Sequence, residues 1–137
     1  MTESQNKMLP VPDDDSRFFW EAGKDGHLKI QECRDCAVLI HPPGPVCPHC
    51  LGENVAPRVV SGRAKVHSYS VNVQPWFPDM TVPFILASVE LEEQAGLRVT
   101  THLDGIPPEA ARIGMLVEVA FRHDEDVWLP IFRPAAV

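Results

Sequence analysis

Four cysteines arranged in two short pairs constrain this chain more than any other feature of its sequence. The pairs are Cys33-Arg34-Asp35-Cys36 and Cys47-Pro48-His49-Cys50, and ten residues separate them. Two Cys-x-x-Cys turns can place four sulfurs at the corners of a tetrahedron, a geometry that Zn²⁺ accepts with sulfur at ~2.3 Å. Four cysteine ligands also close the coordination sphere, which leaves no position for a catalytic water or substrate. The pattern therefore predicts one structural zinc ion per chain, bound by Cys33, Cys36, Cys47 and Cys50.

Other uses of the four cysteines depend on the compartment and on the surrounding fold. The N-terminal residues 1–16 include acidic side chains and have no apolar core, so we do not expect a secretory signal. No apolar stretch approaches the ~20 residues that span a membrane. We therefore expect a cytoplasmic protein, in which paired disulfides are rare. Disulfides, redox chemistry and an iron–sulfur site remain the alternatives, and His41 and His49 are expected at the surface or around the ligands.

Length and composition exclude several classes of protein. A chain of 137 residues suggests one domain with at most a small satellite, and it is too short for a (β/α)₈ barrel of ~250 residues. Its 14 prolines argue against a helical bundle, because proline interrupts helix interiors. With 12 basic against 19 acidic residues and a net charge of −7, nonspecific binding to nucleic acid is disfavoured.

The residues after the cysteines alternate between apolar and polar side chains, which is typical of half-buried strands. The expected strands are 68–73, 85–92, 97–103, 115–122 and 127–132. A hairpin is expected at residues 94–96, and one helical turn at 107–112 between the third and fourth strands. This pattern fits a five-stranded OB-fold barrel, with a small sandwich as the alternative.

A short helix and two short strands are expected before the barrel. The helix should cover Arg17–Ala22 and end at Gly23, and the strands Leu28–Glu32 and Val55–Val60 flank the cysteines. The predicted fold class is mainly β: an N-terminal helix and a rubredoxin-like zinc ribbon followed by an OB-fold barrel. The expected divisions are residues 1–26 for the arm and helix, 27–60 for the ribbon and 61–137 for the barrel.

Two groups of aromatic residues are candidates for contacts outside the chain. Consecutive helical residues lie ~100° apart, so Phe18, Phe19 and Trp20 cannot all face one core stripe. We expect one of them to be exposed or to meet another chain, the alternative being that all three pack on the rest of this protein. Trp76 and Phe77, in a loop bounded by prolines, are expected to form an apolar rim with Phe84.

This rim has three possible roles. It can be a partner interface, because aromatic side chains are favoured anchors there, or it can cap one end of the barrel. It can also stack on the adenine of a coenzyme, in which case Arg63 and Lys65 are candidates for its phosphates. The candidate CoA-binding residues are therefore Arg63, Lys65, Trp76 and Phe77. The candidate interface residues are Phe18, Phe19, Trp20, Trp76, Phe77 and Phe84.

No set of residues predicts a reaction. His67, His102 and His123 are isolated on different expected strands or loops, and no phosphate-loop, dinucleotide or nucleophile motif occurs. His67 shares the phase of Tyr69 and is expected to be partly buried, whereas His102 shares the polar phase of Thr100. We therefore expect a chain that is not an enzyme on its own.

An ordered set of motifs resembles a known family. The set comprises Phe18-Phe19-Trp20, Gly26-His27-Leu28, the cysteine pairs with Pro42-Pro43 between them, residues 61–69, Val82-Pro83-Phe84, residues 87–91, Ile113-Gly114-Met115 and residues 129–134. Together these motifs resemble the zinc-ribbon/OB-fold proteins associated with acyl-CoA enzymes, long catalogued as a domain of unknown function. The resemblance covers about residues 16–134. It departs at Ala37 and Leu51, where the family often has glycine.

The resemblance implies an accessory subunit whose catalytic partner is a larger thiolase-like enzyme, either a thiolase or a retro-aldolase, and sometimes a hydratase. Such a subunit would support assembly of the complex and would bind or channel a CoA thioester as a shared ligand. A single-stranded nucleic-acid-binding module and an independent hydrolase or hydratase for CoA thioesters are the alternatives.

Overall fold

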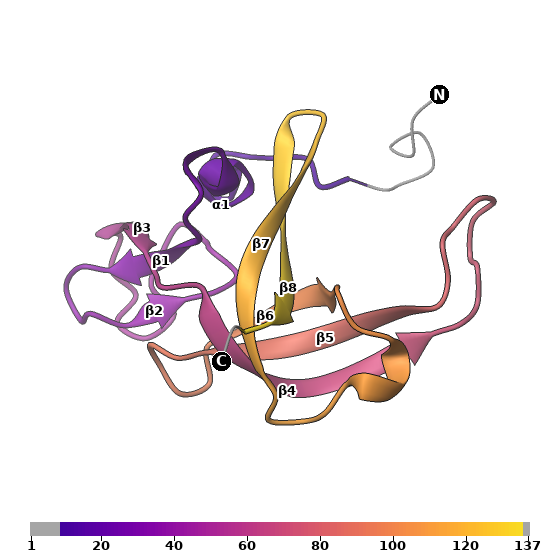
Figure 1. The fold of residues 1–137 in the computed structure, drawn as a ribbon. Helices are drawn as coiled ribbons and strands as arrows, with labels where there is room; N and C mark the ends of the chain where they lie inside the picture. The colour runs from indigo at the N-terminus through magenta and orange to yellow at the C-terminus, as the bar shows by residue number, and fades with distance from the viewer. Residues whose placement is uncertain (1–8, 136–137) are drawn as a thin grey trace.

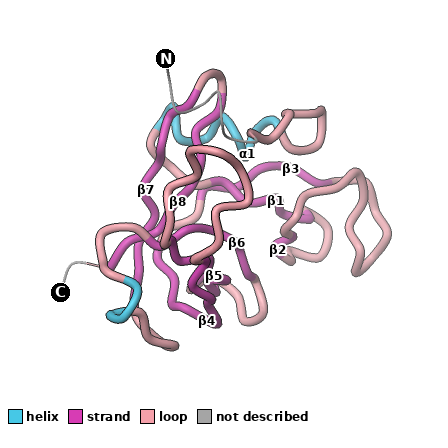
Figure 2. Tube along the Cα trace, turned by 90° about the vertical axis from the view of Figure 1, so that its right-hand side faces the viewer, coloured by secondary structure: helices cyan, strands magenta, loops and turns pink. Residues whose placement is uncertain are grey.

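The computed structural model describes residues 9–135, which form a small three-stranded sheet and a closed five-stranded barrel (Figure 1). The N-terminal elements are α1 (Arg17–Glu21), the 3₁₀ helix η2 (Ala22–Asp25), β1 (Lys29–Cys33), β2 (Leu39–Ile40) and β3 (Val55–Val59). The barrel elements are β4 (Arg63–Asn72), β5 (Phe84–Leu91), β6 (Arg98–Leu103), the 3₁₀ helix η3 (Pro108–Ala110), β7 (Leu116–Asp124) and β8 (Val127–Pro134). In Figure 2 the small sheet lies beside the barrel.

The strand order β4-β5-β6-β8-β7 closes the barrel, which confirms the predicted OB-fold and excludes the sandwich. Closure depends on a short parallel contact between β6 and β8, where Leu103 pairs with Phe132. Alternation places one face of each strand inside, and Phe132 and Val89 are fully buried there. The predicted hairpin at residues 94–96 and the predicted turn, observed as η3, are also confirmed.

The small sheet has the order β2-β1-β3 and carries the cysteines. Both predicted strands, β1 and β3, are present and pair antiparallel from Lys29↔Val59 to Cys33↔Val55. The two-residue strand β2 was not predicted, because two apolar residues between turns carry no periodic signal.

The N-terminal helix does not end at Gly23 as expected, because the chain continues as η2 and ends at Gly26 with φ of +80°. Gly23 is needed for packing instead. A Cβ at this position would lie 2.5 Å from Cβ of Trp128 and 2.6 Å from Phe121 Cδ1. The absence of a side chain therefore allows the helical segment to lie directly on the β7–β8 hairpin, as Figure 1 shows.

The three consecutive aromatics all contact the core of this chain, and Phe18 and Trp20 keep part of their surface exposed. Phe19 is buried in the core, and Phe18 and Trp20 are partly buried against it. The Phe19 and Trp20 rings meet edge to face with centroids 4.8 Å apart. Two consecutive residues can both reach apolar surface here because the core continues around the short helix, from β1 to β8.

Strand β4 departs from the predicted alternation. A register shift between Val66 and Ser68 in the β4–β5 pairing marks a bulge, and His67 is exposed at it rather than partly buried. Beyond the bulge, Tyr69, Val71 and Val73 are exposed by 37%, 37% and 70%. Figure 1 shows the β4–β5 connection extending away from the barrel at this end of β4, where the Tyr69 hydroxyl donates to the Ala111 carbonyl at 3.1 Å.

Candidate metal centre and surrounding surfaces

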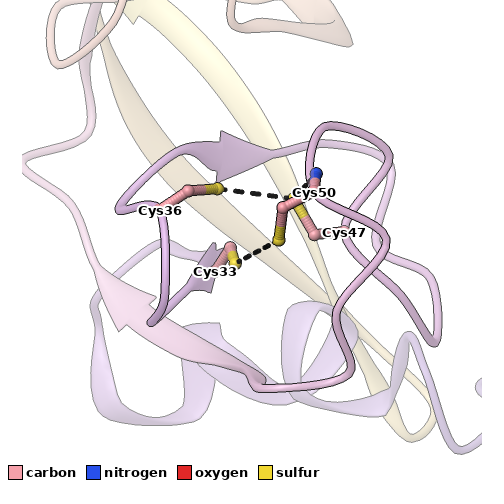
Figure 3. Close-up of side chains that lie close together, drawn as sticks. All are labelled: Cys33, Cys36, Cys47 and Cys50. Carbon is pink, nitrogen blue, oxygen red and sulfur yellow. Dashed lines mark hydrogen bonds between the residues drawn. The ribbon is translucent and has the colours of Figure 1, made fainter.

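The four predicted ligands come together at one point of the small sheet (Figure 3). All four Sγ atoms lie within 4.8 Å of one another, and the Cys33–Cys50 and Cys36–Cys47 pairs are both 3.6 Å apart. A regular tetrahedron of sulfurs ~2.3 Å from a zinc ion has edges of ~3.8 Å. The residues present therefore fit a Cys₄ zinc ion closely.

Each cysteine pair lies on a tight turn closed by a backbone hydrogen bond. The N–H of Ala37 donates to the Cys33 carbonyl at 2.7 Å, and the N–H of Leu51 donates to the Cys47 carbonyl at 2.8 Å. Ala37 and Leu51 have φ of +64° and +65°, the left-handed conformation that glycine adopts without steric cost. The two departures from the family pattern therefore change the backbone strain of the turns and leave the ligand positions intact.

Hydrogen bonds to sulfur favour a thiolate at Cys47. Its Sγ accepts the N–H groups of His49 at 3.3 Å and of Cys50 at 3.4 Å. Burial acts to raise the pKa of the Cys47 thiol, but the N–H groups of Cys50 and His49 and the neighbouring cysteines lower it to about 6.

The Cys36 thiol has the opposite tendency. The backbone N–H of Val38 acts to lower its pKa, but desolvation and hydrogen bonds with the other three cysteines raise it to about 12. Four thiolates so close together repel one another, and a bound divalent cation compensates their negative charge. Zinc bound here would hold all four sulfurs as thiolates and would fix the two turns.

The centre is anchored from inside the small sheet. Cys33 and Cys47 are fully buried and pack with Ile40, whereas Cys50 is exposed. The side chain of Gln31 donates to the Gly44 carbonyl at 2.8 Å and accepts the Gly44 N–H at 3.1 Å. Gln31 is itself 5% exposed, so this pair fixes the proline-rich loop between the cysteine pairs from within.

The two histidines near the centre have different surroundings. His49 is exposed, as expected of a surface residue. The ring of His41 packs on Phe19 at 4.8 Å between centroids, and its Nδ1 is buried with no hydrogen-bond partner in the part of the chain that the structure describes. Burial lowers the pKa of His41 to about 4, so the ring is neutral at physiological pH.

The residues proposed for CoA binding do not form one site. Arg63 begins β4 and donates from Nε to Glu92 Oε2 at 3.1 Å, which raises the pKa of Arg63, and Lys65 lies two residues further along the same strand. Trp76 and Phe77 follow the opposite end of this ten-residue strand, which at ~3.3 Å per residue spans ~30 Å. Trp76 is 68% exposed and its Nε1 donates to Asn72 Oδ1 at 3.1 Å.

The predicted apolar rim borders a groove that the sequence did not reveal. This groove has a volume of about 1010 Å³ and is lined by residues of α1, the β4–β5 connection, β5, β6, the β6–β7 connection, β7 and β8. Trp20, Phe77 and Phe84 line it, whereas Trp76 does not. It joins segments up to about a hundred residues apart in the sequence, so periodicity within single strands carries no signal for it.

The remaining histidines stay apart. His67, His102 and His123 lie on β4, β6 and β7. His102 stacks on Phe84 with centroids 4.7 Å apart and is only partly exposed, although it shares the predicted polar phase. His123 stacks on Trp128 at 4.0 Å.

A four-sulfur centre on a small sheet joined to a closed five-stranded barrel defines a zinc-ribbon/OB-fold protein. Two family models match this architecture: the rubredoxin-like zinc ribbon domain of ChsH2 over residues 20–56 and the C-terminal OB-fold domain of ChsH2 over residues 57–122. The chain belongs to this ChsH2-type DUF35 family, as its resemblance predicted.

Relatives include a DUF35 domain-containing scaffold protein of Methanocaldococcus jannaschii, 36% identical over 76% of this chain and 74% of its own length. A probable enoyl-CoA hydratase alpha subunit of Thermomonospora curvata is 41% identical over 98% of this chain. A 3-oxo-4,17-pregnadiene-20-carboxyl-CoA hydratase alpha subunit of Mycobacterium tuberculosis is 39% identical over 93% of this chain. The chain spans 43% and 40% of the lengths of these two hydratase subunits.

The fold is also similar to a solved chain of the Ltp2-ChsH2(DUF35) aldolase. The TM-score is 0.84 and the identity 40%, over 93% of this chain and 100% of that one.

Proposed function

We propose that this chain is a non-catalytic accessory subunit of an enzyme that acts on acyl-CoA thioesters, with an aldolase or thiolase-like chain as its larger partner. The observation that supports this most is its similarity to a chain of the Ltp2-ChsH2(DUF35) aldolase, which it matches over that chain's whole length. The scaffold names of its archaeal relatives support the same role.

The chemistry of the chain agrees with a supporting role. A Cys₄ zinc ion has no open coordination position, so it stabilises the ribbon rather than activating a water. The three barrel histidines lie on three different strands. In the proposed complex, the catalytic groups belong to the partner chain.

A hydratase is the second candidate partner. In two hydratase alpha subunits the region similar to this chain makes up less than half of the polypeptide. The similarity to these regions is the reason for naming a hydratase among the candidate partners. We also propose that this subunit binds the CoA thioester. Two separate regions are candidates for this binding: the loop with Trp76 and Phe77, and the start of β4 with Arg63 and Lys65.

Co-expression tests the assembly. We expect the chain to co-elute with an Ltp2-type aldolase subunit in size-exclusion chromatography and to raise that subunit's aldol-cleavage activity. Trp76→Ala combined with Phe77→Ala should weaken the complex if the exposed loop contacts the partner. Leu116→Ala is a matched control, because Leu116 and Trp76 are both 68% exposed and Leu116 begins β7. Separate elution from both aldolase and hydratase subunits, with full partner activity in its absence, would contradict the proposal.

Nucleic-acid binding is the alternative function, since OB-folds commonly bind single strands. The excess of 19 acidic over 12 basic residues opposes it. Salt-dependent binding of a single-stranded oligonucleotide at physiological ionic strength would favour it over the accessory role. Within the described residues no helix is long and apolar enough to cross a membrane.

A further inference from the structure

The groove of about 1010 Å³ beside the barrel is lined mainly by apolar side chains from segments distant in the sequence. Trp20, Phe77, Phe84, Leu86, Leu129 and Ile131 are among them. Pockets for small molecules typically combine such a lining with a few polar groups that fix the ligand's orientation. The polar groups of this groove therefore indicate which ligand it can hold.

Arg122 is the only arginine or lysine that lines the groove within the described residues. It lies on β7 opposite Leu129 of β8, and both side chains border the groove. Its Nε is buried, and among the described residues Arg122 Nε has no hydrogen-bond partner and the side chain forms no ion pair with a carboxylate. A guanidinium in such a place has donors in a fixed planar arrangement that matches a carboxylate.

The other charged side chains restrict the ligand further. Asp79 and Asp104 also line the groove, so among the described residues its lining holds carboxylates as well as the arginine. Inside the groove the Asp104 carboxylate would repel the several charges of a polyanion such as a nucleoside diphosphate. One carboxylate placed against Arg122 is compatible with the lining, and the apolar side chains of the groove favour an apolar body for the remainder of the ligand.

We propose that this groove binds a small molecule with an apolar body and one carboxylate, and that Arg122 pairs with the carboxylate through its terminal guanidinium nitrogens. The apolar body lies against Leu86, Leu129 and Ile131, and the Phe84–His102 stack borders it. This site goes beyond the proposed accessory role and does not depend on it, because this chain alone provides the residues. The acid can be a free fatty or ring-containing acid, or an acyl compound with a second carboxyl group.

Titration of the zinc-loaded full chain with dodecanoate, below its micelle-forming concentration, tests the site. Binding is measured by calorimetry and located by amide chemical shifts. We expect shifts at β5, β6, β8 and the β4–β5 connection, and clearly weaker binding of dodecanol, which lacks the carboxylate. Arg122→Gln should weaken dodecanoate binding by about 10- to 100-fold, the effect of a lost charged hydrogen bond. Arg133→Gln is the matched control, because Arg133 lies on β8 and does not line the groove.

A second variant keeps the test decisive if Arg122→Gln does not fold. Leu86 is 41% exposed in the groove, so Leu86→Ser should fold and should weaken both dodecanoate and dodecanol. Two further probes distinguish the sources of the carboxylate: cholate represents ring-containing acids, and succinyl-CoA represents acyl compounds with a second carboxyl group. The site is supported if any of the three acids binds and the Arg122→Gln substitution weakens that binding. Equal binding of dodecanoate and dodecanol, shifts confined to other surfaces, or unchanged affinity in Arg122→Gln would overturn it.

Discussion

The side-chain amide of Gln94 pairs with both backbone groups of Leu39, which joins the ribbon to the barrel. Leu39 N–H donates to Gln94 Oε1 at 2.9 Å, and Gln94 Nε2 donates to the Leu39 carbonyl at 2.9 Å. Gln94 lies in the turn between β5 and β6, and Leu39 begins β2, 55 residues earlier. The amide thus completes the hydrogen bonding of the shortest strand in the small sheet and fixes that sheet against the barrel.

Gln94→Ala should lower the free energy of unfolding by about 1–3 kcal/mol, because it leaves two partly buried backbone groups unpaired. Chemical denaturation measures this loss, and hydrogen exchange should accelerate most at the Leu39 amide. Gln74→Ala, in the exposed β4–β5 connection, is the control and should change stability little. Unchanged exchange at Leu39 in Gln94→Ala would show that the pairing does not hold the two sheets together.

Cys36→Ser or Cys50→Ser should remove one equivalent of zinc and unfold the small sheet, because the energy of metal binding is folding energy in such sites. Metal analysis and amide spectra of the purified variants measure both effects. We expect the barrel signals to survive better than those around the cysteines, since the cluster of Cys33, Ile40 and Cys47 packs separately from the main core. A variant with stoichiometric zinc and native stability would refute the four-cysteine assignment.

Ala37→Gly and Leu51→Gly should each raise stability by about 1 kcal/mol. Both residues hold left-handed φ values, +64° and +65°, that cost an L-residue roughly 1–2 kcal/mol and glycine little. Leu51 is 74% exposed, so its side chain contributes little burial to offset the gain. Thermal unfolding of the zinc-loaded variants measures the change. The exposed Ala95 lies outside the left-handed region, so Ala95→Gly should be neutral or destabilising, and an equal gain there would contradict the argument.

The sequence predicted the parts of the fold that depend on local pattern. Spacing alone was sufficient for the cysteine cluster, because two short turns bring the four sulfurs together, and strand alternation was sufficient for the barrel. Prediction from the sequence failed where contacts between residues far apart in the chain decide the structure. The end of the helix was misplaced because Gly23 packs against Phe121 and Trp128, about a hundred residues away.

The same limit applies to the surfaces. The bulge at Val66–Ser68 reversed the expected burial of His67, and a bulge has no signature in alternating side chains. Trp76 and Phe77 were predicted to form an aromatic rim, but the groove that Phe77 lines was not predicted, since Arg122 and Leu129 reach it from the other end of the chain.

Gly23→Ala should destabilise the protein strongly, by about 2–4 kcal/mol, because the new Cβ would lie 2.5 Å from Trp128 Cβ. Neither the hairpin nor the helical segment can move without breaking other core contacts. Gly44→Ala is a matched control, because nothing lies within 4 Å of a Cβ there and its φ is not left-handed. Chemical denaturation compares the two. Similar small losses for both variants would show that the helical segment can shift away from the hairpin.

His41 should make the protein less stable as the pH falls below about 6.5. Its pKa is about 4 in the folded protein, against 6.5 for an ordinary histidine, because the ring is buried against Phe19. Below pH 6.5 protons bind the unfolded chain first, so the contribution of His41 is complete above that pH and is lost progressively towards pH 4. The loss is of order 3 kcal/mol. Zinc release at low pH affects any variant with the four cysteines, so the informative measurement is the difference from His41→Phe, which keeps an aromatic ring and cannot titrate. His41→Phe should lose less stability between pH 7 and pH 4.5 than the natural chain, and parallel stability curves would refute the assignment.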